Sequence, residues 1–176
     1  VYIGYESPSW IGTMMALSNA VSSKVKYCKE YGIDIEKDEW NIDRIPKAIS
    51  FDIDEWKDTS IKSLINSLRI NIQNMPKYRA YYRGIVERAF NIIRLEYETF
   101  IPKYVIKNSR LDIYEFTQII IKSILKYNNH TYVGGYNSSH KEIEDGINLT
   151  PKKIWELGLE NKIDRFKSVD STEIMK

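Results

Sequence analysis

Residues 76–100, PKYRAYYRGIVERAFNIIRLEYETF, combine a basic aromatic segment with a strongly periodic one. The first part has no hydrophobic period and predicts a mobile loop; Gly84 then opens a predicted helix. Its apolar positions recur at helical spacing and form one stripe: Val86, Ala89, Phe90, Ile93, Tyr97 and Phe100. Glu87 falls roughly 100° from the centre of this stripe at 3.6 residues per turn. We therefore expect its carboxylate at the edge of the core, on the side of the helix shared by Arg83, Asn91 and Arg94.

Positive charge is concentrated in the same stretch. Five basic residues against the single acid Glu87 give residues 76–94 a net charge of +4, in a chain whose net charge is +2: Lys77, Arg79, Arg83, Arg88 and Arg94. Such a patch faces an anion. With the interleaved tyrosines Tyr78, Tyr81 and Tyr82, it could follow a DNA strand through phosphate contacts and stacking. The alternatives are a solvated loop with partly packed aromatics and, for Arg88 and Arg94, pairing with acids such as Glu98.

The composition is that of an ordinary soluble domain. The chain has 176 residues, 43% hydrophobic and 28% charged, enough for one domain with a sizeable core. No run of 18 apolar residues occurs, which excludes a typical membrane helix. The single Cys28 excludes an internal disulfide and fits a reducing, cytoplasmic compartment. The chain begins at Val1 inside a strand-like stretch, so we expect it to be a fragment.

The first hundred residues alternate between strand and helix patterns. We expect a strand over 1–6, a helix from about 8 to 31 with Gly32 as its C-cap, and a strand over 48–51 that ends at Asp52. A short helix over 59–68 and a strand over 69–74 follow. This alternation predicts an α/β fold with helices that cover a sheet.

The last part of the chain carries two further helix patterns. Asp112 begins an apolar helix that ends near Asn128, and Thr150-Pro151 is a helix-start signal for a short helix over about 150–160. We place one domain at 1–128 and a C-terminal extension at 129–176. We expect His130 to have a capping or packing role and the four tryptophans to be core or edge anchors.

Asp52 and Glu87 are the candidate catalytic and metal-binding residues. Thirty-five positions separate them, one at a strand tip and one in the first turn of a helix. Carboxylates on such rigid elements can hold two divalent ions for an in-line phosphoryl transfer. With 24 acids in the chain, however, this spacing also arises by chance. Glu87 could simply favour a helix N-terminus, and Asp52 could be an ordinary turn residue.

Several segments together resemble the retroviral-integrase-type, RNase H-like DDE transposases, most closely the TnsB branch. They are Gly4-Tyr5-Glu6-Ser7-Pro8, Ile49-Ser50-Phe51-Asp52, Gly84-Ile85-Val86-Glu87-Arg88-Ala89-Phe90, the helix over 111–121, Asn128-Asn129-His130, and Leu149-Thr150-Pro151 with Ile154-Trp155-Glu156-Leu157-Gly158. The resemblance spans nearly the whole chain and includes the interval between Asp52 and Glu87.

The resemblance implies an RNase H-like core, a mixed sheet flanked by helices, that lacks its first strands. It also implies that Asp52 and Glu87 are the second and third metal ligands for two Mg²⁺ or Mn²⁺ ions. The first acid would lie before Val1, so the chain alone is predicted to be inactive. Asp54 stands where the family often has glycine, which puts the local backbone shape and metal occupancy in question. Asp54 and Glu55 could be auxiliary metal ligands or part of a solvated turn.

The function that this resemblance implies is metal-dependent 3′-end cleavage and strand transfer in cut-and-paste transposition. The expected partners are transposon-end and target DNA, further copies of the protein in a transpososome and other transposition proteins, but no membrane. The expected location is the bacterial cytoplasm, at the nucleoid. One alternative is a catalytically dead DNA-binding or assembly module of the same fold, and another is a helical interaction protein without a site.

Overall fold

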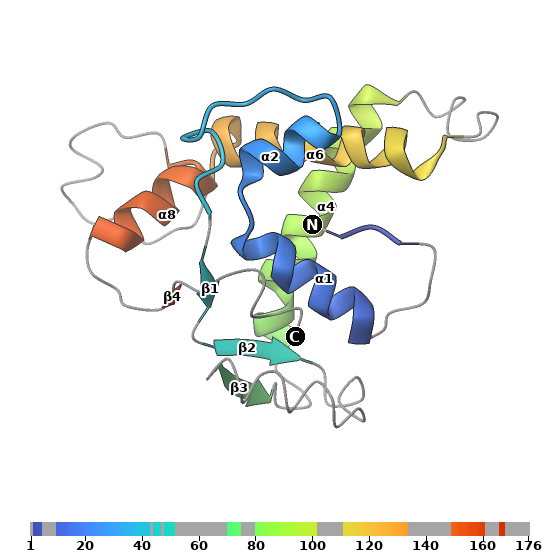
Figure 1. Ribbon diagram of the computed structural model, residues 1–176. Helices are drawn as coiled ribbons and strands as arrows, with labels where there is room; N and C mark the ends of the chain where they lie inside the picture. The colour runs from blue at the N-terminus through green and yellow to red at the C-terminus, as the bar shows by residue number, and fades with distance from the viewer. Residues whose placement is uncertain are drawn as a thin grey trace.

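A computed structural model describes residues 2–4, 10–42, 44–46, 48–51, 70–74, 80–101, 111–133, 149–160 and 166–167. Five helices lie in these ranges: α1 (Trp10–Val21), α2 (Lys24–Glu30), α4 (Ala80–Phe100), α6 (Ile113–His130) and α8 (Pro151–Glu160). The strands are β1 (Ile45–Pro46), β2 (Ala48–Phe51), β3 (Asn71–Asn74) and β4 (Phe166–Lys167). Figure 1 shows their arrangement.

The predicted RNase H-like fold, a mixed sheet flanked by helices, is wrong for the described part of the chain. The helices are 7 to 21 residues long, whereas the strands have only 2 to 4 residues. Within the described ranges the strands form two separate pairs, β1 with β4 antiparallel and β2 with β3 parallel. Tyr2–Gly4, expected in a strand, has no regular secondary structure. The helices therefore pack on one another instead of covering a sheet.

The predicted strand over 48–51 is confirmed as β2, and the strand predicted over 69–74 is confirmed in shortened form as β3. Their parallel register runs from Ala48 opposite Asn71 to Phe51 opposite Asn74. The alternation of patterns thus located these two strands, but the α/β sheet that it predicted is wrong. The expected helix over 59–68 lies outside the described residues.

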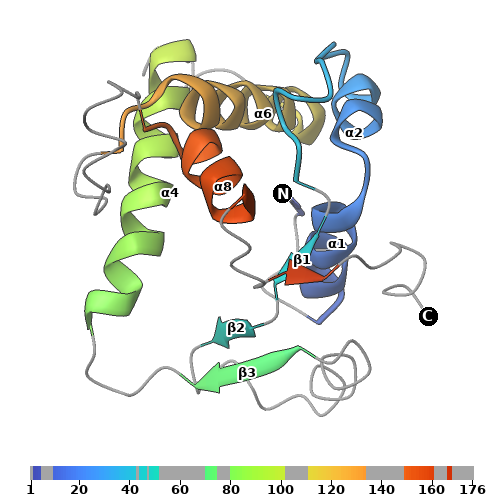
Figure 2. The same cartoon turned by 90° about the vertical axis from the view of Figure 1, so that its left-hand side faces the viewer.

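Helix α6 is the centre of the packing. Helices α2, α4 and α8 lie around it, as the two views in Figures 1 and 2 show. The buried core consists of Cys28 on α2, Trp40 in the segment after it, and Ile121 and Ile124 on α6. Ser123 and Thr117 are also buried on α6, and their hydroxyls donate to the carbonyls of Ile119 (2.9 Å) and Ile113 (2.6 Å). These bonds satisfy hydroxyls that would otherwise be costly to bury.

The single helix expected up to about residue 31 is divided into α1 and α2 between Val21 and Lys24. Lys24 stabilises this break between the two helices. Its side chain is buried, and its ammonium group donates to the carbonyls of Asn19 (2.6 Å), Ala20 (3.0 Å) and Ser22 (2.8 Å). These carbonyls at the end of α1 need partners because the helix no longer continues past them.

Gly32 ends α2, as predicted. Its φ of 66° lies in the left-handed region that glycine adopts without strain. The amide of Gly32 donates to the carbonyl of Lys29, and the amide of Ile33 donates to that of Cys28, both at 3.0 Å. This is the Schellman pattern of helix termination. From α6, Gln118 donates to the carbonyl of Tyr31 at 2.7 Å and ties this turn to the central helix.

The predicted starts of the last two helices are confirmed. Asp112 accepts from the amide of Glu115 at 2.7 Å, and the Glu115 carboxylate accepts from the amide of Asp112 at 3.2 Å, which is a capping box at the start of α6. Thr150 accepts from the amide of Lys153 at 3.3 Å before Pro151 begins α8. The division into domains at residue 128 stays a prediction. No helix within the described residues has the length and apolar character that crossing a membrane requires.

Candidate nucleic-acid interface on helix α4

Helix α4 begins at Ala80, four residues before the predicted start at Gly84. Residues 80–83 are therefore helical and not part of a loop. None of these residues interrupts a helix, and Gly84 is tolerated in the interior because glycine costs only about 1 kcal/mol there. The position of Arg83 consequently lies on the helix, three turns before that of Arg94.

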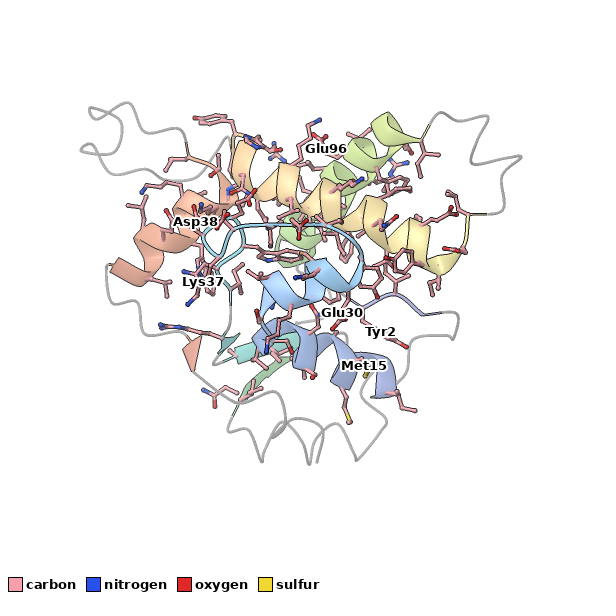
Figure 3. The ribbon with its side chains drawn as sticks, turned by 45° about the horizontal axis from the view of Figure 1, so that its top comes forward. Tyr2, Met15, Glu30, Lys37, Asp38 and Glu96 are labelled. Carbon is pink, nitrogen blue, oxygen red and sulfur yellow. The ribbon has the colours of Figure 1, made fainter. Side chains whose placement is uncertain are left out.

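The buried side of α4 agrees with the predicted stripe at Ile93 and Tyr97 but differs from it at Phe90. Ile93 packs against the core, and the Tyr97 ring lies 6.0 Å from that of Phe116 on α6. Glu96 faces α6 as well, where it forms an ion pair with Lys126 (Figure 3). Phe90, predicted to be in the stripe, is 70% exposed. The helix is rotated so that Glu96 lies in the contact with α6 and Phe90 does not.

This rotation also moves Glu87. Its side chain is exposed, so the prediction that it lies at the edge of the core is wrong. Arg88 and Asn91 are exposed as well. We use the term outer face of α4 for the exposed residues Glu87, Arg88, Phe90, Asn91, Arg94 and Leu95.

The other predicted site residues cannot be placed beside Glu87. Asp52, with the neighbouring Asp54 and Glu55, lies outside the described residues, as do Lys77 and Arg79; for Arg83 only the backbone is described. In the described ranges, no three His, Cys, Asp or Glu side chains come together where they could hold a metal ion. The pairing of Asp52 with Glu87 around Mg²⁺ or Mn²⁺ therefore stays a prediction.

Arg88 and Arg94 are the predicted DNA-binding side chains that the structure describes, and both are exposed. Arg94 donates to Glu98 at 3.4 Å, one turn further along the helix, and its side chain keeps 54% of its surface exposed. The sequence left phosphate contact and pairing with Glu98 as alternatives, and the structure contains this pairing. An exposed pair of this spacing contributes only about 0.3–0.5 kcal/mol. Arg94 can therefore exchange Glu98 for a stronger anionic partner at little cost.

Phe90 was missed as a surface residue. It lies one helical turn before Arg94 on the same side of α4. An exposed aromatic ring beside an arginine is a combination that stacks on nucleic-acid bases. The signal in the sequence was weak, because a phenylalanine at helical spacing usually belongs to the core. The contact of Glu96 with Lys126 shows which side of α4 faces α6.

Comparison with known proteins places the chain in a family. The TnsB C-terminal domain family matches residues 1–103. The chain is also 27% identical over 187 residues to the Transposon Tn7 transposition protein TnsB of Escherichia coli, over 98% of this chain and 26% of that protein. The chain thus spans about a quarter of the length of this curated relative.

The match confirms the resemblance to the TnsB branch and overturns the RNase H-like core, because the matched family is a C-terminal domain and the described residues are mainly packed helices. The family match includes β2, β3 and the whole of α4, and hence its outer face. This chain belongs to the TnsB C-terminal domain family.

Proposed function

We propose that this chain is a DNA-binding module of a TnsB-type transposase and that the outer face of α4 contacts DNA. The observation that carries the proposal is the joint exposure of Arg88, Phe90 and Arg94 on one helix. Membership of the TnsB C-terminal domain family and similarity to a transposition protein support it. The finding therefore favours the DNA-binding alternative over a catalytic core.

Each group has a defined role in this proposal. Arg88 and Arg94 bind phosphate oxygens, because guanidinium groups form charge-assisted and often bidentate bonds to phosphate. Phe90 stacks on a base or packs on a sugar beside Arg94, which lies one turn further along the same side of the helix. Lys77, Arg79 and Arg83 precede these residues in the sequence and extend the positive charge along the backbone of the nucleic acid. Glu98 is displaced from Arg94 when phosphate binds.

The salt dependence of DNA binding tests the two arginines. Arg88→Ala and Arg94→Ala should each weaken binding to a fluorescein-labelled duplex and lower the slope of log K against log salt by about 1. Lys26→Ala is the matched control, because Lys26 is an exposed cation on α2. Fluorescence anisotropy between low and moderate salt measures the slope. An equal loss for all three variants would indicate unspecific attraction and contradict the proposed interface.

Phe90 is tested on single-stranded DNA, whose bases are open to stacking. Phe90→Ala should cost about 1–3 kcal/mol of binding free energy if one base stacks on the ring. Tyr132→Ala serves as the control, because Tyr132 is 66% exposed but follows α6. If both variants bind as the wild type does, Phe90 is not part of the interface.

We further propose, from the sequence pattern, that Asp52 and Glu87 bind Mg²⁺ or Mn²⁺ in the parent transposase, for 3′-end cleavage and strand transfer. The exposure of Glu87 beside Arg88 favours this proposal, because an exposed carboxylate can reach both a metal ion and DNA. A divalent ion would activate water or a 3′-hydroxyl and stabilise the leaving oxygen. In this role the protein would act on transposon ends and target DNA, together with further copies and other transposition proteins.

Metal binding can be measured without any DNA. Mn²⁺ should broaden the amide signals around Glu87 in NMR spectra, and both Asp52→Asn and Glu87→Gln should weaken the effect. Glu98→Gln is the control, because Glu98 lies on the same helix three turns further on. Unchanged broadening in the two test variants would rule out this metal site.

A further inference from the structure

A small cavity lies between α8, the segment that follows α2 and the end of α6. Its volume is about 130 Å³, and none of the described residues that line it belongs to α4. The lining residues are Glu39, Trp40, Asn41, Ile42, Asn128, Pro151, Lys152, Trp155, Glu156 and Leu159. Cavities of roughly 150 Å³ in other proteins hold one benzene molecule. This cavity therefore has room for one apolar side chain of about the size of phenylalanine or leucine.

The wall opposite α8 is held in place by bonds that do not depend on any ligand. Trp40 is buried in the core cluster with Cys28 and Ile121. The amide of Glu36 donates to the Glu39 carboxylate at 2.7 Å and closes a turn. Asn129 on α6 donates to the carbonyl of Glu39 at 3.0 Å. The cavity is thus formed in advance, which lowers the cost of binding.

The rim of the cavity carries more negative than positive charge. Among the residues that line the cavity, the carboxylates of Glu39 and Glu156 stand against the single ammonium group of Lys152, and Asp38 and Lys153 lie at the margin, where they pair with Lys152 and Glu156. Lys152 lies 3.5 Å from Asp38 and 3.9 Å from Glu156, and Lys153 lies 3.5 Å from Glu156. The Asp38 side chain is 80% exposed (Figure 3). Exposed pairs at such distances contribute about 0–1 kcal/mol, so cations from another molecule can compete for these carboxylates.

We propose that this cavity docks a segment of a partner protein that presents one apolar side chain flanked by basic residues. The volume limits the anchor to a single side chain, and two tryptophans with a leucine offer it an apolar surface: Trp40, Trp155 and Leu159. The carboxylates of Asp38, Glu39 and Glu156 select the basic flanks. Because α4 takes no part, the docking site is separate from the proposed DNA interface.

Calorimetry with capped synthetic pentapeptides tests the site on the full 176-residue chain. The probe is Lys-Arg-Phe-Lys-Arg; one comparison peptide has alanine at its centre, and another has glutamates as flanks. We expect the probe to bind at least about tenfold more tightly than either comparison peptide. Equal affinity for the alanine peptide would refute the apolar anchor, and equal affinity for the acidic peptide would refute the selection of basic flanks.

Two variants locate the binding. Leu159→Phe fills the cavity and should weaken the probe at least about tenfold, whereas Leu95→Phe makes the same change on the exposed outer face of α4 and should have no effect. Glu156→Gln alters only a partly exposed rim residue and should weaken the probe a few-fold. Glu30→Gln is its control, on the exposed surface of α2. Unchanged affinity in both cavity variants would place the peptide elsewhere and refute the site.

A second copy of the chain is the competing occupant. Sedimentation velocity would then show self-association that Leu159→Phe abolishes, and this result would overturn the partner-peptide proposal. The variant with both Arg88→Ala and Arg94→Ala should keep full affinity for the peptide. Failure of peptide docking and failure of DNA binding are therefore distinguishable.

Discussion

Around α6, apolar side chains are enclosed, and the buried hydroxyls of Thr117 and Ser123 have hydrogen-bond partners. Ile121 and Ser123 are 0% exposed, and the Ser123 hydroxyl donates to the carbonyl of Ile119. On the outer face of α4, Phe90 is 70% exposed and Leu95 is 56% exposed. Both regions contain large apolar side chains, but only those around α6 are buried and stabilise the fold. The exposed apolar side chains on the outer face of α4 are available for contacts with other molecules.

The largest effect should come from truncating the same kind of side chain in the two regions. Ile121→Ala leaves a cavity in the core and should lower the free energy of unfolding by about 2–5 kcal/mol. Leu95→Ala should change it by less than about 0.5 kcal/mol, because Leu95 is mostly in solvent. Urea denaturation measures both values. Similar losses would mean that the outer face of α4 is packed, which would remove the basis of the comparison.

Two glycines allow a sharper test with one and the same substitution. Gly32→Ala should destabilise by about 1–2 kcal/mol, because its φ of 66° strains a residue with a Cβ atom. The added Cβ itself has room, since the nearest atom would be the Gln118 amide nitrogen at 3.7 Å.

Gly158→Ala should instead stabilise by about 0.5–1 kcal/mol, because Gly158 lies inside α8 and its added Cβ would meet no atom within 4 Å beyond the adjacent residues and the backbone of its own helix. Thermal unfolding of the two variants should therefore shift in opposite directions. A loss of stability in both would contradict the role of Gly32 as the conformational end of α2.

Burial makes the stability of the α6 side depend on pH. Burial raises the pKa of the Cys28 thiol to about 11 despite the opposing influence of Lys24. The unfolded chain releases this proton at lower pH, near the ordinary thiol pKa of 9.0. The contribution of the Cys28 thiol to the free energy of unfolding is therefore fully present below about pH 9 and is lost as the pH rises towards 11. Thermal melts from pH 8 to 11 measure the loss, and Cys28→Ala should remove this component.

A second group titrates in a higher range. Burial, followed by the neighbouring Tyr31, Cys28 and Glu30, raises the pKa of Tyr27 to about 12 from its ordinary 10.0. Because the pKa of Tyr27 is also higher in the folded state than in the unfolded state, its contribution to the free energy of unfolding declines from about pH 10 to 12. A Cys28→Ala protein should keep this second decline. Rapid alkylation of Cys28 in the folded protein at pH 8 would contradict its burial, because only the thiolate reacts.

The smallest effect concerns the pair on α4. Glu98→Gln removes the partner of Arg94 and should lower the free energy of unfolding by only about 0.3–0.5 kcal/mol. The same change should raise affinity for duplex DNA, because Arg94 no longer has to leave a carboxylate. Glu30→Gln is the control for the loss of one negative charge. Weaker DNA binding by Glu98→Gln would contradict the proposed exchange of Glu98 for phosphate.

Local signals were the most predictable part of the molecule. The structure confirms the helix ends predicted at Asp112, at Thr150 before Pro151, and at Gly32. These signals depend on short-range hydrogen bonds and backbone conformation, so neighbouring residues suffice to read them. The rotation of α4 was not predictable in this way. Phe90, expected in the core stripe, is exposed, whereas Glu96 lies in the contact with α6, where it pairs with Lys126, thirty positions further along the chain.

The sequence by itself determined the starts of α6 and α8, the end of α2 at Gly32 and the place where basic residues accumulate, and it carried the resemblance to the TnsB branch. It did not determine whether the segments would cover a sheet or pack on α6, because one apolar stripe can bury itself against either surface. Only the tertiary structure decided this, by enclosing α6 among three other helices and leaving Phe90 with Arg88 and Arg94 in solvent. The cavity beside α8 is likewise tertiary, because its walls come from three separate parts of the chain.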